Sequence, residues 1–215
     1  MNSGSIHVLM AMLAFSIAAN APTGSAEPDA PRVFDLVLEG GSVWKGWGSR
    51  PSVADIGING DRIAAIGDLS EYVAKQIIVL DGLAVVPGFI DIHSHAVRDT
   101  REESGIFRHP DAENYIRQGV TTVIGGPDGG SELSIAKLLS DLESTPATVN
   151  FGSFIGHNTV RKEVMGREDR APTVAELEAM KTLVRTAMLD GAYGLSSGLK
   201  YIPCLLYTSD AADEM

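Results

Sequence analysis

The sequence predicts an α/β fold, an incomplete (β/α)₈ TIM barrel of about four β/α units preceded by a small antiparallel β-sandwich portion. Three observations support this prediction. Short strand-like segments separated by turn residues fill 33–85. Strand-like and helix-like segments alternate from Pro87 onward. An apolar, β-branched run from Leu83 to Ile92 predicts a buried strand, and it ends in two histidines.

The first 32 residues are expected to precede the folded part. Val8 to Ala19 is apolar but too short to span a membrane, as in a secretory signal peptide. Small residues before Glu27 predict cleavage there, which gives a signal peptide at 1–26 and a leader at 27–32. No Lys or Arg precedes the apolar run, so a disordered or misassigned start is the alternative. We expect a periplasmic or secreted protein without a stable membrane anchor.

The β-sandwich portion, 33–85, is read from alternation and turn residues. Gly40-Gly41 is expected to end the first strand, and Asn59-Gly60-Asp61 has the chemistry of a hairpin turn. Strands are expected at 34–39, from 43, and at 53–58, 62–67, 77–82 and 84–86.

The barrel portion, 86–203, is expected to contain helices at 111–118, 133–142 and 173–189, and strands at 120–124, 148–155 and 192–196. Thr173 and Glu176 have the spacing of a capping box at the start of the last helix. A complete barrel needs about 250 residues, so four units make about half of one.

His93 and His95 follow the buried strand directly. Side chains two apart on a strand point to the same face, so both imidazoles can reach one metal ion. The C-terminal rim of barrel strands is where barrel enzymes keep their chemistry. The alternative is a pair of ordinary polar residues at a strand end.

The last residues, 204–215, resemble a translated adapter of short-read DNA libraries, and an ordinary acidic tail is the alternative. On the adapter interpretation the only cysteine, Cys204, is not native, and no thiol chemistry can be argued. Removing the three acidic residues of this tail changes the formal net charge from −11 to −8. The acidic balance argues against a nucleic-acid partner.

Several motifs resemble the amidohydrolase superfamily and, within it, the N-acyl-D-amino-acid deacylase (D-aminoacylase) branch. The superfamily signature is Pro-Gly-Phe-Ile-Asp-x-His-x-His at 87–95. The branch motifs are Gln-Gly-Val-Thr-Thr-Val at 118–123, Gly156-His157 with Arg161 and Val164-Met165-Gly166 after it, and Gly-Leu-Ser-Ser-Gly-Leu at 194–199 with Tyr201 and Pro203.

The resemblance implies a (β/α)₈ barrel with a β-sandwich, one or two zinc ions, and hydrolysis of an N-acyl-D-amino acid or a related small amide. It makes His93 and His95 metal ligands. The branch usually has a metal-binding cysteine where Asp128 stands, and a carboxylate can also bind zinc. The alternative for Asp128 is a turn aspartate between glycines.

The resemblance also suggests His157 and Tyr201 as substrate-binding residues. The alternatives are a His157 that caps the next turn and a buried structural Tyr201. Arg161 is expected to form ion pairs at the surface or in a loop, with a substrate clamp as the alternative. The fourth strand carries no lysine, which argues against the hydantoinase type with its carboxylated lysine.

The catalytic residues are unknown and expected in the missing C-terminal half, so the chain itself is expected to be inactive. Two other functions stay open. One is a different amidohydrolase, such as a dipeptidase or cyclic amidase. The other is a non-catalytic metal- or ligand-binding relative. It is suggested by Asp128 in place of the branch's cysteine and by Ala96, where the family often has an acidic residue.

Overall fold

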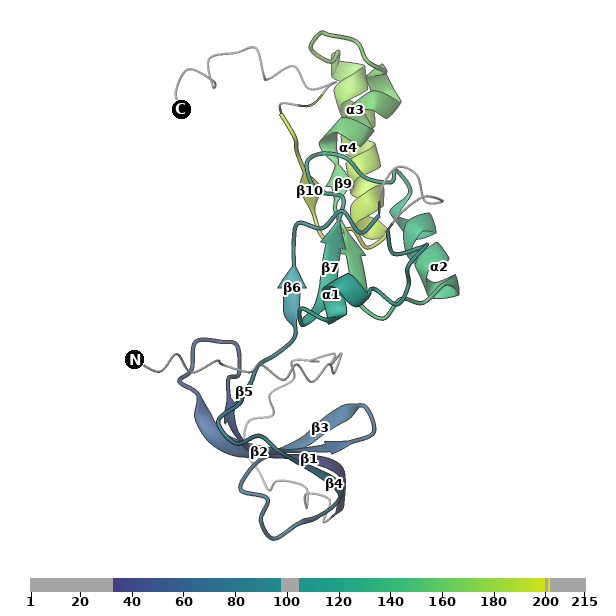
Figure 1. Ribbon diagram of the computed structural model, residues 1–215. Coiled ribbons are helices and arrows are strands. Elements are labelled where there is room, and N and C mark those ends of the chain that lie inside the picture. The colour runs from purple at the N-terminus through teal and green to yellow at the C-terminus, as the bar shows by residue number, and fades with distance from the viewer. Residues whose placement is uncertain (1–32, 98–104, 200, 202–215) are drawn as a thin grey trace, which may run out of the picture. The chain divides into compact units, whose positions relative to one another are not determined.

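The computed structural model describes residues 33–97, 105–199 and 201, and the chain divides into two compact units, 1–88 and 89–215. The described part is an α/β structure with mixed sheets (Figure 1). The expected signal peptide, the leader and the adapter-like tail lie outside the described residues. Within the described residues, no helix combines the length and apolar character that a membrane crossing requires.

The first unit contains one sheet in which β3, β2, β1 and β4 follow one another, while β5 also pairs with β1. Strand β1 is antiparallel to β2 but parallel to β4 and β5, so the expected all-antiparallel layer is wrong. A chain that returns to β1 through a connection instead of a hairpin can pair in parallel. The strands are β1 (Val33–Val43), β2 (Ser52–Asn59), β3 (Arg62–Gly67), β4 (Val73–Val79) and β5 (Ala84–Val85).

Gly40-Gly41 does not end the first strand as expected, because β1 continues through it with a shift in register between Leu38 and Gly41. Gly40 has a φ of +71°, which suits a bulge residue without a side chain. A Cβ at Gly41 would lie 2.8 Å from the Leu80 side chain. Residues 33–39 of β1 pair with β4, and Ser42 and Val43 pair with β5. The core below it contains Leu38, Val43, Ile56, Ile58 and Leu80.

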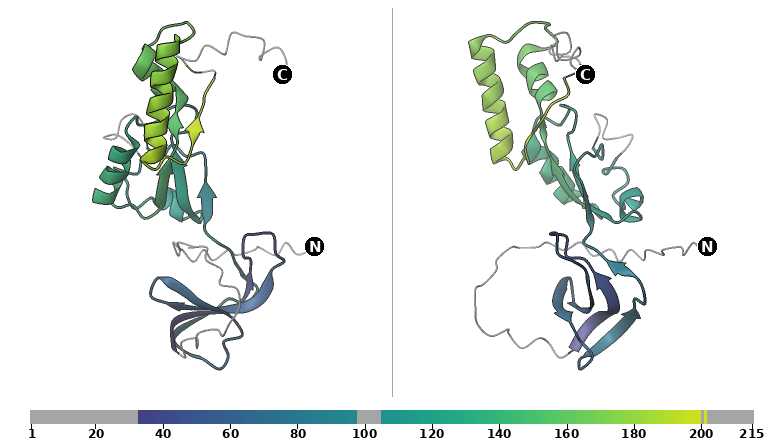
Figure 2. Two further views of the ribbon diagram at one scale, coloured as in Figure 1. Left: turned by 180° about the vertical axis from the view of Figure 1, so that it is seen from behind. Right: turned by 90° about the vertical axis from the view of Figure 1, so that its left-hand side faces the viewer.

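The second unit is built from parallel strand pairs and helices. Strands β6, β7 and β8 form a parallel sheet in sequence order, and β9 pairs in parallel with β10. Helices α3 and α4 lie side by side (Figures 1 and 2). The strands are β6 (Phe89–Asp91), β7 (Val120–Gly125), β8 (Asn150–Ser153), β9 (Ile155–Gly156) and β10 (Leu195–Ser196). The helices are α1 (Glu113–Ile116), α2 (Ile135–Ser144), α3 (His157–Met165) and α4 (Val174–Leu189).

The expected buried strand between Leu83 and Ile92 is divided and exposed. Strand β5 ends at Val85, β6 begins at Phe89, and Pro87-Gly88 lies between them. Phe89 and Ile90 are 52% and 64% exposed. Strand β6 is the edge of its sheet, so in the described part of the chain only β7 pairs with it. Leu83 and Val85 still pack against the core of the first unit, whereas Phe89 and Ile90 are uncovered among the described residues.

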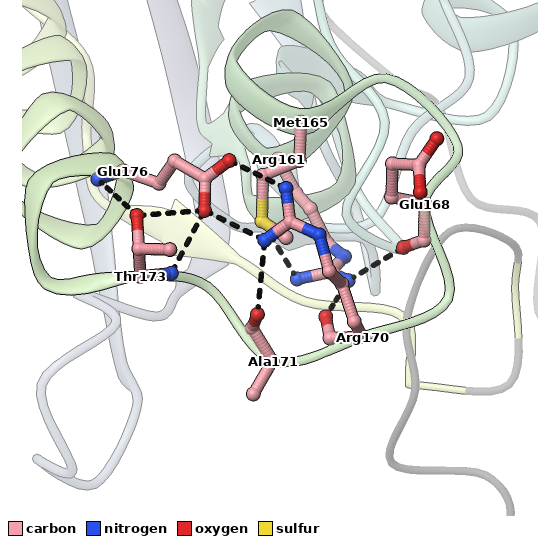
Figure 3. Close-up of polar contacts among 7 residues, drawn as sticks. All are labelled: Arg161, Met165, Glu168, Arg170, Ala171, Thr173 and Glu176. Carbon is pink, nitrogen blue, oxygen red and sulfur yellow. Dashed lines mark hydrogen bonds and ion pairs between the residues drawn. The ribbon is translucent and has the colours of Figure 1, made fainter.

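The core of the helical side lies between α2, α3, α4 and β9. Helix α4 begins at the predicted capping box: Glu176 N–H donates to Thr173 Oγ1, and Thr173 N–H donates to the Glu176 carboxylate (Figure 3). Arg170 also bonds this carboxylate, and mainly for that reason the pKa of Glu176 lies far below its usual range. The buried core residues are Ile135, Ile155, Val160, Met165, Met180, Ala187 and Ala192.

Arg161 is not the surface or loop residue that the sequence suggested. It is 4% exposed and donates to the main-chain carbonyls of Glu168 and Arg170, at 2.9 and 2.6 Å (Figure 3). A guanidinium with several donors can satisfy carbonyls that would otherwise be buried without partners. Arg161 therefore holds the loop between α3 and α4 in place.

Candidate metal centre

The two histidines follow β6 in a segment that still bonds to the neighbouring strand β7. Ser94 N–H donates to the Ile124 carbonyl at 3.0 Å, which continues the contact between β6 and β7. Ser94 is 2% exposed, whereas the side chains of His93 and His95 are 61% and 52% exposed. Exposure thus alternates over 93–95, and the two imidazoles come together on the exposed side, as the spacing predicted.

Side-chain hydrogen bonds hold this segment. Ser94 Oγ lies 2.8 Å from the Tyr115 hydroxyl and accepts a hydrogen bond from Ala96 N–H at 3.0 Å. On the other side, His93 N–H donates to Asp91 Oδ1 at 3.0 Å. The backbone that carries the two imidazoles is therefore fixed from both sides.

Asp128 reaches the histidines from the turn that follows β7. Its Oδ2 atom lies 3.2 Å from His93 Nε2 and 3.4 Å from His95 Nε2. Asp128 has a φ of +57°, a left-handed conformation that is uncommon for residues other than glycine. Strained backbone is often found at functional sites, and here it points a carboxylate at two imidazoles.

The spacing of the three donor atoms is compatible with a bound metal ion such as zinc. Four donors placed tetrahedrally at zinc–ligand distances lie roughly 3.3 Å from one another, close to the two separations found here. All three donors lie within 4.8 Å of one another. Two neutral imidazoles and one carboxylate are also a known zinc ligand set. The structure therefore brings together His93, His95 and Asp128 in a group that can hold a metal.

His157 is not brought into this group. It is the first residue of α3, and its ring lines a pocket of about 390 Å³ with Leu177, Met180 and other residues of α3, α4 and β10. Its Nδ1 atom is buried without a hydrogen-bond partner among the described residues. Burial, and then the nearby charge of Arg161, lower the pKa of His157. His157 directly follows β9, at the strand end where the sequence placed it.

Tyr201 is not one of the three donors, but its ring and the carbonyl oxygen of Asp128 both lie close to Gly198. It is 45% exposed, and its N–H donates to the Gly198 carbonyl at 3.1 Å. It is therefore not a buried structural tyrosine in the described part of the chain. A role for Tyr201 or His157 in substrate binding stays a prediction.

Sequence reasoning missed two serines near the site. Ser94 lies between the two histidines, and Ser196 binds the turn that carries Asp128. The only signal for Ser196 was its place in the Gly-Leu-Ser-Ser-Gly-Leu motif.

Comparisons with known proteins identify relatives of this chain. No family model matches the chain. It is 38% identical to a D-aminoacylase of Alcaligenes xylosoxydans xylosoxydans over 85% of this chain and 41% of that protein. An N-acyl-D-aspartate deacylase and an N-acyl-D-glutamate deacylase of the same organism are 32% and 34% identical, over 85% and 79% of this chain and 40% and 38% of theirs. The chain thus spans about two fifths of the length of these relatives.

Solved structures of the same kinds of enzyme also match this chain. A D-aminoacylase described as defining a novel subset of amidohydrolases matches with a TM-score of 0.70 and 35% identity, over 79% of this chain and 40% of that one. An N-acyl-D-glutamate deacylase from Bordetella bronchiseptica, complexed with zinc and a phosphonate inhibitor, matches with a TM-score of 0.71 and 29% identity, over 84% and 41%. Another D-aminoacylase structure, with a TM-score of 0.69 and 35% identity over 79% and 40%, concerns its binuclear metal centre.

The resemblance that the motifs suggested is confirmed by sequence and by structure. Over about two fifths of their length, this chain is a homologue of the D-aminoacylases and N-acyl-D-amino-acid deacylases, which are amidohydrolases.

Proposed function

We propose that the parent protein of this chain is a metal-dependent hydrolase that removes the acyl group from N-acyl-D-amino acids. The observation that supports this most is the group of His93, His95 and Asp128 at zinc-ligand spacing in a homologue of three such deacylases. The substrate is a small N-acyl amino acid.

His93 and His95 would hold zinc through neutral imidazole nitrogens, and the Asp128 carboxylate would add one negative charge to the site. A bound zinc ion supplies a Lewis acid for an amide carbonyl and lowers the pKa of a bound water. The three side chains are one third to two thirds exposed, which leaves room for a ligand to approach them. We place the general base and further metal ligands in the part of the parent that this chain does not span.

We also propose that residues 86–203 form the first four β/α units of a (β/α)₈ barrel, after a β-sandwich portion at 33–85. The support is the parallel order β6, β7, β8 and the parallel pair β9 and β10, with helices between them. Backbone bonds link the two sheets, since Phe154 N–H donates to Gly125 O and Tyr193 N–H to Ser153 O. The outer strands β6 and β10 carry exposed apolar residues that further barrel strands would cover.

Sequencing the locus past codon 203 tests whether the reading frame continues into further barrel sequence. Our proposal expects further β/α units with additional histidine ligands in place of the adapter-like tail 204–215. A genomic stop codon after Met215 would show that the tail is native, and the enzyme proposal would then fail for this chain.

The activity is tested with the parent protein expressed from the complete gene. Zinc-loaded protein should release free amino acid from N-acetyl-D-amino acids and not from the L-enantiomers, and an excess of chelator should abolish this. Equal turnover of N-acetyl-L-amino acids, or activity that survives complete removal of metal, would contradict the proposal.

Export to the periplasm or medium is a further part of the proposal, supported by the apolar stretch from Val8 to Ala19. N-terminal sequencing of the mature protein should begin at Glu27. A mature protein that retains Met1 in the cytoplasm would contradict export.

A further inference from the structure

One serine hydroxyl ties the turn that carries Asp128 to strand β10. Ser196 Oγ donates to the Gly126 carbonyl at 2.6 Å and accepts a hydrogen bond from Gly129 N–H at 3.1 Å. Ser196 lies 70 residues after Gly126 in the chain. A single side chain therefore joins both ends of the turn, and Asp128 lies between these ends.

This turn needs support from outside, because several of its residues have left-handed backbone. The φ angles of Gly126, Asp128 and Gly129 are +70°, +57° and +78°. For a residue with a Cβ this region costs about 1–2 kcal/mol, so the conformation persists only where other contacts enforce it. The Gly129 carbonyl supplies one such contact by accepting from Asn158 N–H at 2.9 Å.

The same motif touches the turn at a second point. Gly198 is buried, and a Cβ at this position would collide with the carbonyl oxygen of Asp128. The Asn158 side-chain amide donates to the Gly198 carbonyl at 3.2 Å, which links this contact to α3. Ser197, between the two contact residues, is exposed. The two residues of the Gly-Leu-Ser-Ser-Gly-Leu motif that meet the turn are thus Ser196 and Gly198.

We infer that Ser196 is a positioning residue for the metal site: its hydroxyl fixes the turn so that the Asp128 carboxylate meets His93 and His95. This inference rests on the proposed metal-binding function. Without the hydroxyl, Gly126 O and Gly129 N–H lose their shared partner, and the turn can relax away from its left-handed conformation. Loss of a group that orients a metal ligand typically lowers metal affinity 10- to 100-fold.

The test compares zinc affinities of the parent protein and its variants by competition with a chromophoric chelator. The zinc affinity of Asp128→Asn is measured first, and the ion whose binding is weakened is the one that Asp128 holds. For that ion, Ser196→Ala should weaken binding about 10- to 100-fold. Ser196→Thr, which keeps a hydroxyl, should restore most of the affinity. Ser197→Ala is the matched control and should bind zinc like the wild type.

Thermal unfolding in excess chelator measures the stability of each variant without bound metal. It therefore separates a loss of zinc affinity that comes from a displaced Asp128 from a general loss of stability. If Ser196→Ala does not fold, Ser196→Cys, with its weaker hydrogen-bonding sulfur, takes its place with the same expectation. Wild-type zinc affinity in the Ser196 variant, together with weakened binding in Asp128→Asn, would overturn the inference about Ser196. It would leave the proposed metal site intact. Unchanged zinc binding in Asp128→Asn would instead overturn the proposed metal site.

Discussion

At the scale of single residues, the site depends on side chains whose partners are distant in the chain. The metal-ligating character of His93 and His95 could be predicted, because two positions on one strand share a face. Asp128 could be named only through the family resemblance, because nothing local shows that its carboxylate meets both imidazoles. The roles of Ser94 and Ser196 could not be predicted, since their hydrogen bonds join residues far apart in sequence.

His157 gives a pH-dependent prediction at this scale. Burial lowers its pKa in the folded protein, so below the ordinary histidine pKa the unfolded chain binds a proton that the folded protein resists. The free energy of unfolding should therefore fall as pH decreases below about 6.5. His157→Gln should reduce this pH dependence, measured by chemical unfolding between pH 5 and 7 in excess chelator.

The matched control is His109→Gln, which removes a histidine from an exposed position. An identical pH slope in the wild type and in His157→Gln would show that His157 is not held neutral by burial.

At the scale of elements, local signals were most reliable where a side chain itself marks a boundary. The start of α4 was predicted because Thr173 and Glu176 form a capping box. Helix α3 was not predicted, because its N-cap is Gly156 and no side chain caps it. The parallel pairing of β1 with β4 and β5 was missed because periodicity indicates strands but not their direction.

Thr173→Ala tests the contribution of the capping box. Removal of the hydroxyl leaves Glu176 N–H without its acceptor and should lower the free energy of unfolding by about 1 kcal/mol. Urea unfolding of the parent protein measures the difference. Thr182→Ala is the control, because Thr182 is exposed within the same helix and alanine is the better helix former. Equal destabilisation by the two substitutions would contradict a capping role for Thr173.

At the scale of the whole molecule, the sequence predicted an α/β chain that carries part of a barrel, and the structure shows the parallel strands that such a barrel needs. The expectation of a buried strand before His93 failed for a physical reason. Burial depends on neighbours on both sides, and in the described residues β6 has a neighbouring strand on one side only. Composition and periodicity show that a segment is apolar and strand-like. Whether it is buried depends on the other strands and helices that cover it.

The most direct test of the central claim is a crystal structure of the parent protein with anomalous diffraction recorded at the zinc absorption edge. The account predicts a zinc peak about 2.0–2.2 Å from a nitrogen of His93, a nitrogen of His95 and a carboxylate oxygen of Asp128. Zinc bound elsewhere in the protein, with no peak among these three side chains, would contradict it.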